Sequence, residues 1–202
     1  MIKAVVFDLG RVLLWFDNGL FIRALAERSG RTAEEVREIA HANLDLIRGF
    51  DRGDVAAGDF RTGVCAALGL DLGEGEFWSV YADIFTVHAP GLDVARRLRS
   101  SGLKLVLLSN TDPVRYEFVR SRFPETQFFD AYVLSYELGL LKPEPGIYLE
   151  AARRAGCPPE ECVFIDDLAE NVAGAEAVGM TGIVYAPKTD LAAALRCLGI
   201  EV

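Results

Sequence analysis

The second half of the chain alternates short apolar runs with longer helical patterns. The runs carry aliphatic or aromatic residues at nearly every position and fall at 105–108, 132–134, 162–165 and 182–185. Uninterrupted runs of this length are typical of strands buried on both faces of a parallel sheet. One helical pattern precedes them, beginning near Pro90, and those between them begin near Pro113, Gly146 and Glu170. Because strand–helix–strand crossovers are right-handed, the alternation predicts an α/β fold with a doubly wound parallel sheet.

The chain opens with another apolar run, 2–7, which is followed directly by the carboxylate of Asp8. Open α/β sheets bind their ligands outside the carboxyl ends of the strands, at a switch in strand order. Asp8 is therefore the first candidate for chemistry. Gly10 is the second residue to explain, because it stands two positions further on, where a second acid would be expected.

Residues 17–85 have a different pattern, with no convincing strand. Helices are expected at 20–28, 33–41, 55–68 and 74–85, separated by glycine-containing breaks at 30–32, 49–53 and 69–75. The aromatic residues of this stretch are mostly spaced as the buried faces of helices. We therefore expect a small helical domain, 17–86, inserted into a Rossmann-like core made of 1–16 and 87–202.

Composition and charge narrow the class of protein. Hydrophobic residues make up 51% of the chain and charged residues 25%, as in ordinary globular proteins. No apolar run approaches the ~20 residues of a membrane span. The net charge of −9 opposes binding to nucleic acid and to anionic membranes, so neither is an expected partner. The four cysteines match no zinc or redox spacing and are expected to be free thiols of a cytoplasmic protein, a monomer or homodimer.

Polar residues also follow the later strands. Ser109 and Asn110 come directly after the run 105–108, and Lys142 lies in a loop with two prolines. Each has an ordinary explanation when taken alone. Ser109 would serve as a cap for the next helix, and a lone loop lysine is most often solvated. Together with Asp8, however, they lie at the same predicted edge of the sheet.

The adjacent carboxylates of Asp166 and Asp167 end the run 162–165 and join Asp8 at that edge. They would also suit the start of the following helix. Like charges held close together raise one another's pKa unless a cation lies between them. A bound metal ion resolves the conflict, so the sequence predicts a metal site there.

Phosphoryl transfer through a carboxylate nucleophile needs such a set of residues. Asp8 would attack phosphorus and form an aspartyl-phosphate, which divides one difficult hydrolysis into two steps. Because nucleophile and phosphate are both anionic, a hard divalent cation such as Mg²⁺ must bridge them. Its expected ligands are Asp8, Asp166, Asp167 and the backbone carbonyl of Gly10.

The phosphate itself needs hydrogen-bond donors and positive charge. Ser109, with the N–H groups of Asn110 and Thr111 near a helix start, is expected to hold its oxygens. Lys142 would neutralise the charge that spreads over those oxygens in the transition state. The expected substrate is therefore a small phosphorylated metabolite.

The chain resembles the haloacid dehalogenase-like hydrolase superfamily over essentially its whole length. Four motifs appear in the order of that superfamily, namely Phe7-Asp8-Leu9-Gly10-Arg11-Val12-Leu13, Leu108-Ser109-Asn110-Thr111, Gly139-Leu140-Leu141-Lys142-Pro143-Glu144-Pro145 and Phe164-Ile165-Asp166-Asp167. The match is to the branch called capped subfamily I, in which a helical cap follows the first strand. The motifs are also similar to those of α-D-glucose-1-phosphate phosphatases, where glycine likewise stands two residues after the nucleophile. This narrower resemblance implies a sugar phosphate or similar substrate.

Gly10 departs from the pattern of most phosphatases of this superfamily. Their residue at this position is a second aspartate, which protonates the leaving group and later activates water. General acid–base help is worth ~10²–10⁴ in rate, so simple alkyl phosphates should be poor substrates unless another acid replaces it. Asp17 is the nearest candidate in the sequence. Arg11 would instead stabilise the departing oxyanion.

Two other classes of function remain open from the sequence. A haloacid dehalogenase would use Asp8 to displace halide and would need no metal, but the acidic pair at 166–167 and the absence of tyrosine near Gly10 argue against it. A non-catalytic phosphometabolite-binding protein or phospho-acceptor switch would also combine an aspartate, a hydroxyl group, a lysine and an acidic pair. Receiver domains of that kind carry their acidic pair at the first strand and are too short for this helical insertion.

Overall fold

Five parallel strands form the centre of the computed structural model, which describes all 202 residues. The strands are β1 (Ala4–Phe7), β4 (Lys104–Ser109), β5 (Ala131–Leu134), β6 (Cys162–Asp166) and β7 (Thr181–Val184). Their order is β5-β4-β1-β6-β7, and Phe7 of β1 pairs with Leu107 on one side and Ile165 on the other. The predicted α/β fold with a parallel sheet is confirmed. The direction of winding reverses at β1, which places the end of β1 at the switch in strand order.

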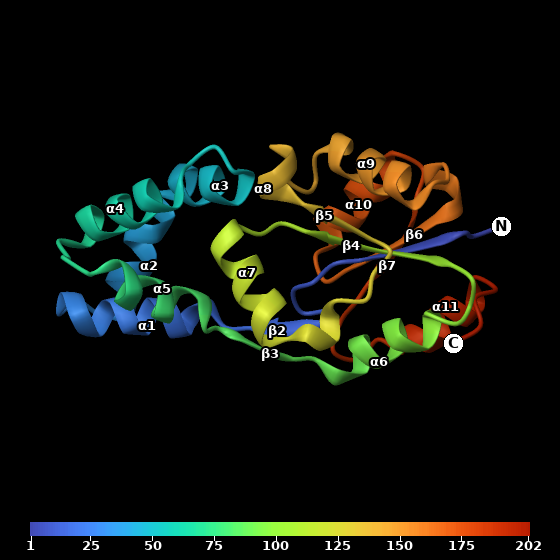
Figure 1. Cartoon of the computed structure of the whole chain (residues 1–202), viewed down its shortest axis with the longest axis horizontal. Coiled ribbons are helices and arrows are strands. Elements are labelled where there is room, and N and C mark those ends of the chain that lie inside the picture. Colours follow the sequence, from blue (N-terminus) through green and yellow to red (C-terminus); the bar gives the residue numbers. More distant parts are fainter.

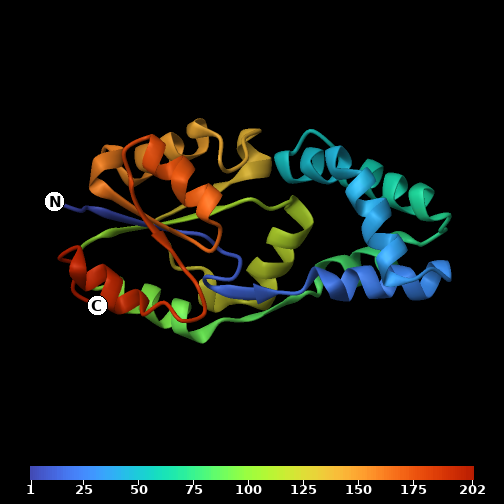
Figure 2. The same ribbon diagram turned by 180° about the vertical axis from the view of Figure 1, so that it is seen from behind.

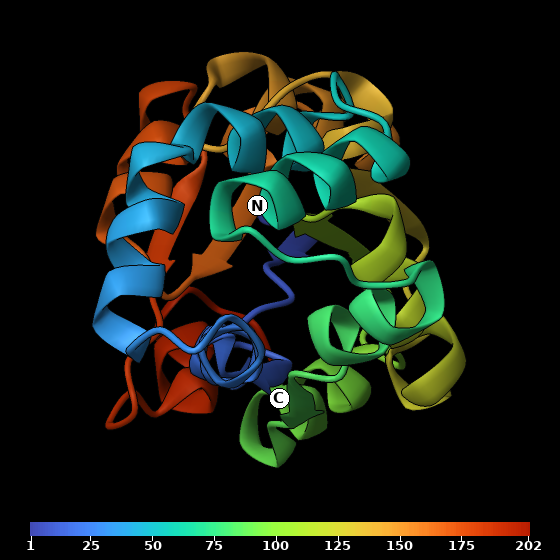
Figure 3. The same cartoon turned by 90° about the vertical axis from the view of Figure 1, so that its left-hand side faces the viewer.

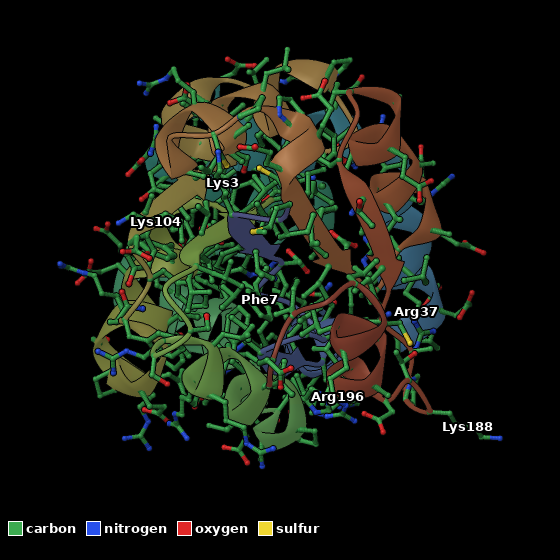
Figure 4. All side chains as sticks on the ribbon, turned by 90° about the vertical axis from the view of Figure 1, so that its right-hand side faces the viewer. Lys3, Phe7, Arg37, Lys104, Lys188 and Arg196 are labelled. Atoms are coloured by element: carbon green, nitrogen blue, oxygen red, sulfur yellow. The ribbon has the colours of Figure 1, made fainter.

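Helices cover both faces of the sheet (Figures 1 and 2). The core helices are α6 (Ala89–Leu98), α7 (Pro113–Arg122), α8 (Ser135–Leu138), α9 (Pro145–Ala155), α10 (Ala169–Ala177) and α11 (Leu191–Cys197), with short 3₁₀ turns at Pro124–Thr126 and Pro159–Glu161. Helices α6, α7 and α11 pack with Val5 and Phe7 on one face, and α9 and α10 pack with Ala4 and Val6 on the other. Figure 4 shows Phe7 in the middle of the packed side chains and Lys188 at the edge of the molecule.

A helical insertion follows β1 and lies over the carboxyl ends of the strands (Figure 1). It contains α1 (Asn18–Ser29), α2 (Ala33–Ala42), α3 (Leu44–Arg52), α4 (Ala57–Leu68) and α5 (Glu74–Ala82). Two antiparallel strands, β2 (Leu14–Phe16) and β3 (Phe85–Val87), connect it to the core. We call α1 to α5 the cap; Figure 3 views the molecule from this end.

The cap differs from the predicted pattern in two places. Helix α3 was not predicted, and a break was expected at 49–53, yet Gly49 lies inside the helix and only Gly53, at φ +87°, ends it. The helix expected at 74–85 stops at Ala82, and Phe85 instead pairs with Phe16 across β2 and β3. Both errors have one cause, because a single glycine or a three-residue strand takes its conformation from tertiary packing.

Aromatic side chains form the centre of the cap, as their spacing predicted. Phe50, Phe60, Phe77 and Tyr81 are all buried there. The Phe50 and Phe60 rings stack with centroids 4.3 Å apart. This separate hydrophobic core gives the cap its own packing, independent of the sheet.

All four cysteines are free thiols, as predicted. Cys65 and Cys162 are buried, whereas Cys197 is exposed. None of the helices combines the length and the apolar composition needed to cross a membrane.

Candidate active site

The ends of the three central strands bring Asp8, Ser109 and Asp166 to one edge of the sheet, beneath the cap. Lys142 reaches the same place from the loop between α8 and α9. A cavity of about 360 Å³ opens there, and Asp8, Ser109 and Lys142 line it. The structure thus gathers the residues that the sequence predicted from four separate segments.

Lys142 is the electrostatic centre of this site. Its Nζ donates to Asp8 Oδ1 at 2.6 Å and to Asp166 Oδ2 at 2.7 Å. All three side chains are almost completely buried. Burial disfavours the charged ammonium, but the two carboxylates outweigh it and raise the pKa of Lys142 above its usual value. The alternative interpretation of Lys142 as a solvated loop lysine is therefore wrong.

Burial has the opposite consequence for Asp8. It raises the pKa of the Asp8 carboxyl to about 7, while Lys142 opposes the rise and Asp166 adds to it. An additional cation beside Asp8 would stabilise its carboxylate, because a nearby positive charge favours the charged form.

Asp166 is fixed by neighbours that follow it in the chain. The backbone N–H of Leu168 donates to Asp166 Oδ1 at 2.8 Å, and the amide of Asn171 donates to both carboxylate oxygens at 3.1 Å. Asn171 is one turn into α10, where its side chain points back to the end of β6. No role was predicted for Asn171, although its place five residues after Asp166 was a usable signal.

A group of three carboxylates fits a metal ion. Asp8, Asp166 and Asp167 each offer an oxygen, and these oxygens lie within 4.8 Å of one another. Burial raises the pKa of Asp167, with Asp166 adding to the rise and Arg11 opposing it. The carbonyl oxygen of Gly10, which lines the same cavity, accepts no hydrogen bond in the chain. Oxygen donors of this kind suit a hard divalent cation.

Asn110 holds the loop that carries Lys142. Its side-chain oxygen accepts from the backbone N–H of Lys142 at 2.8 Å, and its side-chain nitrogen donates to the Lys142 carbonyl at 3.1 Å. Both polar atoms of the Asn110 side chain therefore have a partner, and the groups left for a ligand are the second N–H of the amide and the backbone N–H. That N–H and the N–H of Leu9 make no hydrogen bond within the chain.

The other predicted phosphate contacts fare differently. The nearest acceptor to the buried Ser109 hydroxyl is 3.5 Å away, too far for a strong hydrogen bond, so the hydroxyl is free for a ligand. The N–H of Thr111 is not free, because it donates to Ser135 Oγ at 2.9 Å, and the expectation that it holds phosphate is wrong. The cap of helix α7 is Asp112 and not Ser109 or Thr111.

Phe16 occupies the space beside Gly10. A Cβ atom at position 10 would lie 2.7 Å from Phe16 Cε1. The Arg11 guanidinium lies 5.2 Å from the centre of the same ring and 3.5 Å from Asp167. Arg11 has a left-handed backbone, at φ +57°. Arg11 and Phe16 both line the cavity, so the expectation that Arg11 reaches the ligand is compatible with its position.

Asp17 does not replace an acid at position 10. It is the N-terminal cap of α1, where its side chain accepts from the N–H of Gly19, and it pairs with Arg23 at 2.9 Å. These contacts lower the pKa of the Asp17 carboxyl, which makes it a weak proton donor at neutral pH. Asp17 is exposed and does not line the cavity.

The cavity is also lined by residues that were not predicted from the sequence. Asp51 and Asn18 of the cap line it, together with Arg115 of α7. The Arg115 guanidinium donates to Asn18 Oδ1 at 3.1 Å, and both residues also line a second cavity of about 200 Å³ inside the cap. That second cavity is almost entirely apolar and contains none of the carboxylates of the site. The chemistry therefore belongs to the first cavity.

Known proteins resemble this chain in sequence and in fold. D-ribitol-5-phosphate phosphatase of Bacteroides thetaiotaomicron is 28% identical over 179 residues, which cover 85% of this chain and 86% of that protein. A haloacid dehalogenase-family enzyme of the same organism, crystallised with magnesium and inorganic phosphate, has a TM-score of 0.85 and 25% identity. The match covers 97% of this chain and 100% of that structure. A predicted haloacid dehalogenase-like hydrolase of Porphyromonas gingivalis has a TM-score of 0.83 and 28% identity over the full length of both chains.

The family comparison agrees with the geometry of the site. The model of the haloacid dehalogenase-like hydrolases matches residues 2–179, a range that includes the cap, the sheet strands β1, β4, β5 and β6, and every residue of the carboxylate and lysine cluster; β7 lies just beyond it. The chain therefore belongs to the haloacid dehalogenase-like hydrolase family.

Proposed function

We propose that the protein is a Mg²⁺-dependent phosphatase that hydrolyses a small phosphorylated metabolite through an aspartyl-phosphate intermediate. Asp8 is the nucleophile in this proposal. Lys142 stabilises the charge of the transferring phosphoryl group. Ser109 and the backbone N–H groups of Leu9 and Asn110 bind the phosphate oxygens.

The observation that carries this proposal is the arrangement of charge around Lys142. One ammonium group lies between Asp8 and Asp166 at 2.6 and 2.7 Å, and a third carboxylate, Asp167, stands beside them. The site therefore contains more negative than positive charge before any phosphate enters. A phosphate dianion would be repelled unless a cation joined the three carboxylates.

Mg²⁺ is the cation that this donor set fits best. Asp8, Asp166, Asp167 and the Gly10 carbonyl supply oxygen ligands only, which suits a small hard cation. Bound there, Mg²⁺ would supply Lewis-acid stabilisation of the phosphoryl oxygens. The structural relative of Bacteroides thetaiotaomicron that contains magnesium and phosphate supports this choice.

The substrate class follows from the cavity and from the relatives. Most residues lining the catalytic cavity are polar, and its volume of about 360 Å³ suits a small molecule. We infer a sugar or polyol phosphate, in keeping with the named activity of the ribitol-phosphate phosphatase relative and with the motif resemblance to glucose-1-phosphate phosphatases. The division into a core, 1–16 and 87–202, and a subfamily I cap, 17–86, is part of the same proposal.

Phosphate release from a panel of phosphometabolites tests the proposal directly. The panel contains ribitol 5-phosphate, glucose 1-phosphate, glycerol 3-phosphate and acetyl phosphate, each assayed with Mg²⁺ and with EDTA. We expect Mg²⁺-dependent release from at least one sugar or polyol phosphate and no release from Asp8→Asn. Asp45→Asn, a change of the same kind at an exposed acid of α3, should retain full activity.

Other outcomes would favour one of the two alternative functions, a dehalogenase or a non-catalytic binding protein. Turnover that persists in EDTA would contradict a metal-dependent mechanism, and halide release from 2-haloacids would favour a dehalogenase. Phosphate binding without release would favour a non-catalytic binding protein. Borohydride trapping adds a second readout, because an aspartyl-phosphate is reduced at Asp8 to homoserine, and a site without the intermediate stays unlabelled.

A further inference from the structure

The catalytic cavity has two sides with different chemistry. Asp8 stands at the end of β1, on the core side. In an in-line displacement the leaving oxygen lies opposite the nucleophile. Because the cap covers the ends of the strands, the leaving group of a phosphate held at Asp8 must point toward the cap (Figure 1). A proton donor for that oxygen must therefore come from the cap side.

The lining of the cavity includes three carboxyl groups, those of Asp8, Asp167 and Asp51. Asp8 is the proposed nucleophile, and Asp167 belongs to the core-side group of metal ligands and contacts Arg11. Asp51, near the end of α3, is the one carboxyl group that the cap contributes. It is the acid on the side where the leaving oxygen would lie.

The Asp51 carboxyl is also free to act on a ligand. It makes no hydrogen bond and no ion pair in the structure, and the Ser135 hydroxyl bonds to the backbone carbonyl of Asp51, not to its carboxyl. Asp112, whose charge acts on Asp51, differs in this respect. Its carboxylate accepts from the Tyr81 hydroxyl at 2.7 Å and from two backbone N–H groups of α7 at 2.9 Å. Asp112 is committed to the structure, whereas Asp51 is not.

Contacts with the core hold Asp51 in place. The Ser135 hydroxyl donates to the Asp51 carbonyl at 2.6 Å, and the next residue, Arg52, donates to the carbonyl of Gly139 at 2.9 Å and pairs with Glu144. Gly53 packs so closely on α8 that a Cβ atom there would lie 2.3 Å from the Tyr136 carbonyl oxygen. This docking fixes the end of α3 over the cavity.

The surroundings of Asp51 raise the pKa of its carboxyl toward neutrality. Burial raises the pKa of Asp51 to about 7, and the Asp112 carboxylate adds to the rise while Arg115 opposes it. Tyr81 of α5 contributes a neutral hydroxyl that is bound to Asp112. An acid with a pKa near the working pH is the most effective proton donor and acceptor.

We propose that Asp51 is the general acid and base of this enzyme, in place of the acid that is missing at Gly10. This inference rests on the proposed phosphatase function. In the first step the bond from phosphorus to the leaving oxygen breaks as Asp8 bonds to phosphorus, and Asp51 gives its proton to the leaving oxygen. In the second step water attacks phosphorus. Asp51 takes one proton of that water, the other stays on the released phosphate, and Asp8 is regenerated as a carboxylate.

Leaving groups of different quality distinguish this role from a structural one. Asp51→Asn keeps the size of the side chain and removes the acid. We expect the single-turnover rate constant for formation of the aspartyl-phosphate from glycerol 3-phosphate, whose alkoxide leaves poorly, to fall ~10²–10⁴-fold. We expect the same rate constant with acetyl phosphate, whose carboxylate leaves without a proton, to fall less than about threefold. Asp45→Asn, on the exposed side of the same helix, should change neither rate.

Single-turnover measurement of the first step keeps the test on the leaving group, because the second step is common to all substrates. Equal losses with both phosphates, or no loss with glycerol 3-phosphate, would overturn the role of Asp51. Asp51→Glu should recover part of the rate for glycerol 3-phosphate. Gly53→Ala should also slow glycerol 3-phosphate more than acetyl phosphate, but by a smaller factor than Asp51→Asn does. Absence of turnover by the wild-type protein on every phosphate would overturn the proposed function instead, and this inference with it.

Discussion

The Phe16 ring occupies the space that a side chain at position 10 would need, and both residues line the catalytic cavity. The Cβ of any larger residue at position 10 would lie 2.7 Å from Cε1 and 3.2 Å from Cδ1 of the Phe16 ring. Phe16 is held in β2 by pairing with Phe85, and its ring carries the Arg11 guanidinium at 5.2 Å. The absence of an acid at position 10 is therefore matched by a ring that fills its place.

This relationship predicts that an aspartate at position 10 cannot work alone. In Gly10→Asp the ring of Phe16 must move, which should destabilise the protein by about 1–3 kcal/mol as overpacking does. It should not raise kcat for glycerol 3-phosphate. In the double variant Gly10→Asp with Phe16→Ala the new carboxyl has room, so when Asp51→Asn is added to both proteins, to remove the proposed acid, kcat for this substrate should exceed that of Phe16→Ala by at least tenfold.

Urea unfolding and steady-state kinetics of the three variants check these expectations. Phe16→Ala is the reference, because it opens the space without adding an acid. If Gly10→Asp alone were as stable as the wild type and faster on alkyl phosphates, the two residues would not compete for the same space.

The sequence predicted the core of the fold because its signals are local. The buried runs 105–108 and 162–165 needed only their uninterrupted apolar residues to be recognised as strands, and β4 and β6 confirm them. Asp8 and Asp166 could be placed because they directly follow such runs. Residues at the carboxyl ends of neighbouring parallel strands must meet at one edge of the sheet.

The rest of the site depends on contacts that the sequence does not display. Asp51 lies in a stretch whose glycines predicted a break, and only the docking of α3 on α8 carries it over the cavity. Ser135 is an ordinary serine until the fold places it beside Thr111. Asp17 shows the converse error, since nearness in sequence to the first motif did not bring its side chain into the cavity. Long-range packing decided each of these positions.

Asn110 should matter to activity through the position of Lys142. Asn110→Ala removes both side-chain hydrogen bonds to the Lys142 backbone, at 2.8 and 3.1 Å. We expect a loss of about 1–2 kcal/mol in the free energy of unfolding and a fall in kcat of about tenfold to a hundredfold, because the ammonium is no longer held in place.

A matched change elsewhere separates these two effects. Asn43→Ala in the cap also removes a side-chain hydrogen bond, to the carbonyl of Ile39 at 2.8 Å, but lies away from the carboxylates. It should lower the melting temperature without lowering kcat. A normal kcat in Asn110→Ala would show that the backbone of the loop is held by other contacts.

Mg²⁺ should stabilise the folded protein through Asp167. A ligand that binds only the folded state at a hundred times its Kd adds about 2.7 kcal/mol to the free energy of unfolding, so the melting temperature should rise with Mg²⁺. Asp167→Asn should weaken the apparent affinity for Mg²⁺ by at least tenfold. Its fold should survive, because the one ion pair of Asp167 is the long 3.5 Å contact to Arg11.

Thermal shift titration of wild type, Asp167→Asn and Arg11→Asn provides the measurement. Arg11→Asn breaks the same ion pair but keeps the carboxylate, and asparagine tolerates the left-handed backbone at this position, φ +57°. Its Mg²⁺ response should be close to that of the wild type. Equal weakening in both variants would assign the effect to the ion pair and not to metal coordination.

Asp8 should make the metal-free protein less stable as pH rises. Burial raises the pKa of Asp8 in the folded protein to about 7, from an ordinary value of 3.8 that the unfolded chain retains. Between these values the folded state holds a proton that the unfolded state has lost. The stabilisation is therefore fully present below pH 3.8 and disappears as pH rises to about 7. One such group contributes a slope of at most about 1.4 kcal/mol per pH unit.

Urea unfolding in EDTA at pH 5, 6 and 7 measures this slope. Asp8→Asn should flatten it, because the amide does not titrate and still accepts a hydrogen bond from Lys142. Mg²⁺ should act in the same direction on the wild type, since a bound cation favours the charged carboxylate and its affinity grows as the ligands lose their protons. The fall in stability with pH would then shrink or reverse. An identical slope in Asp8→Asn and wild type would show that Lys142 alone keeps Asp8 charged across this range.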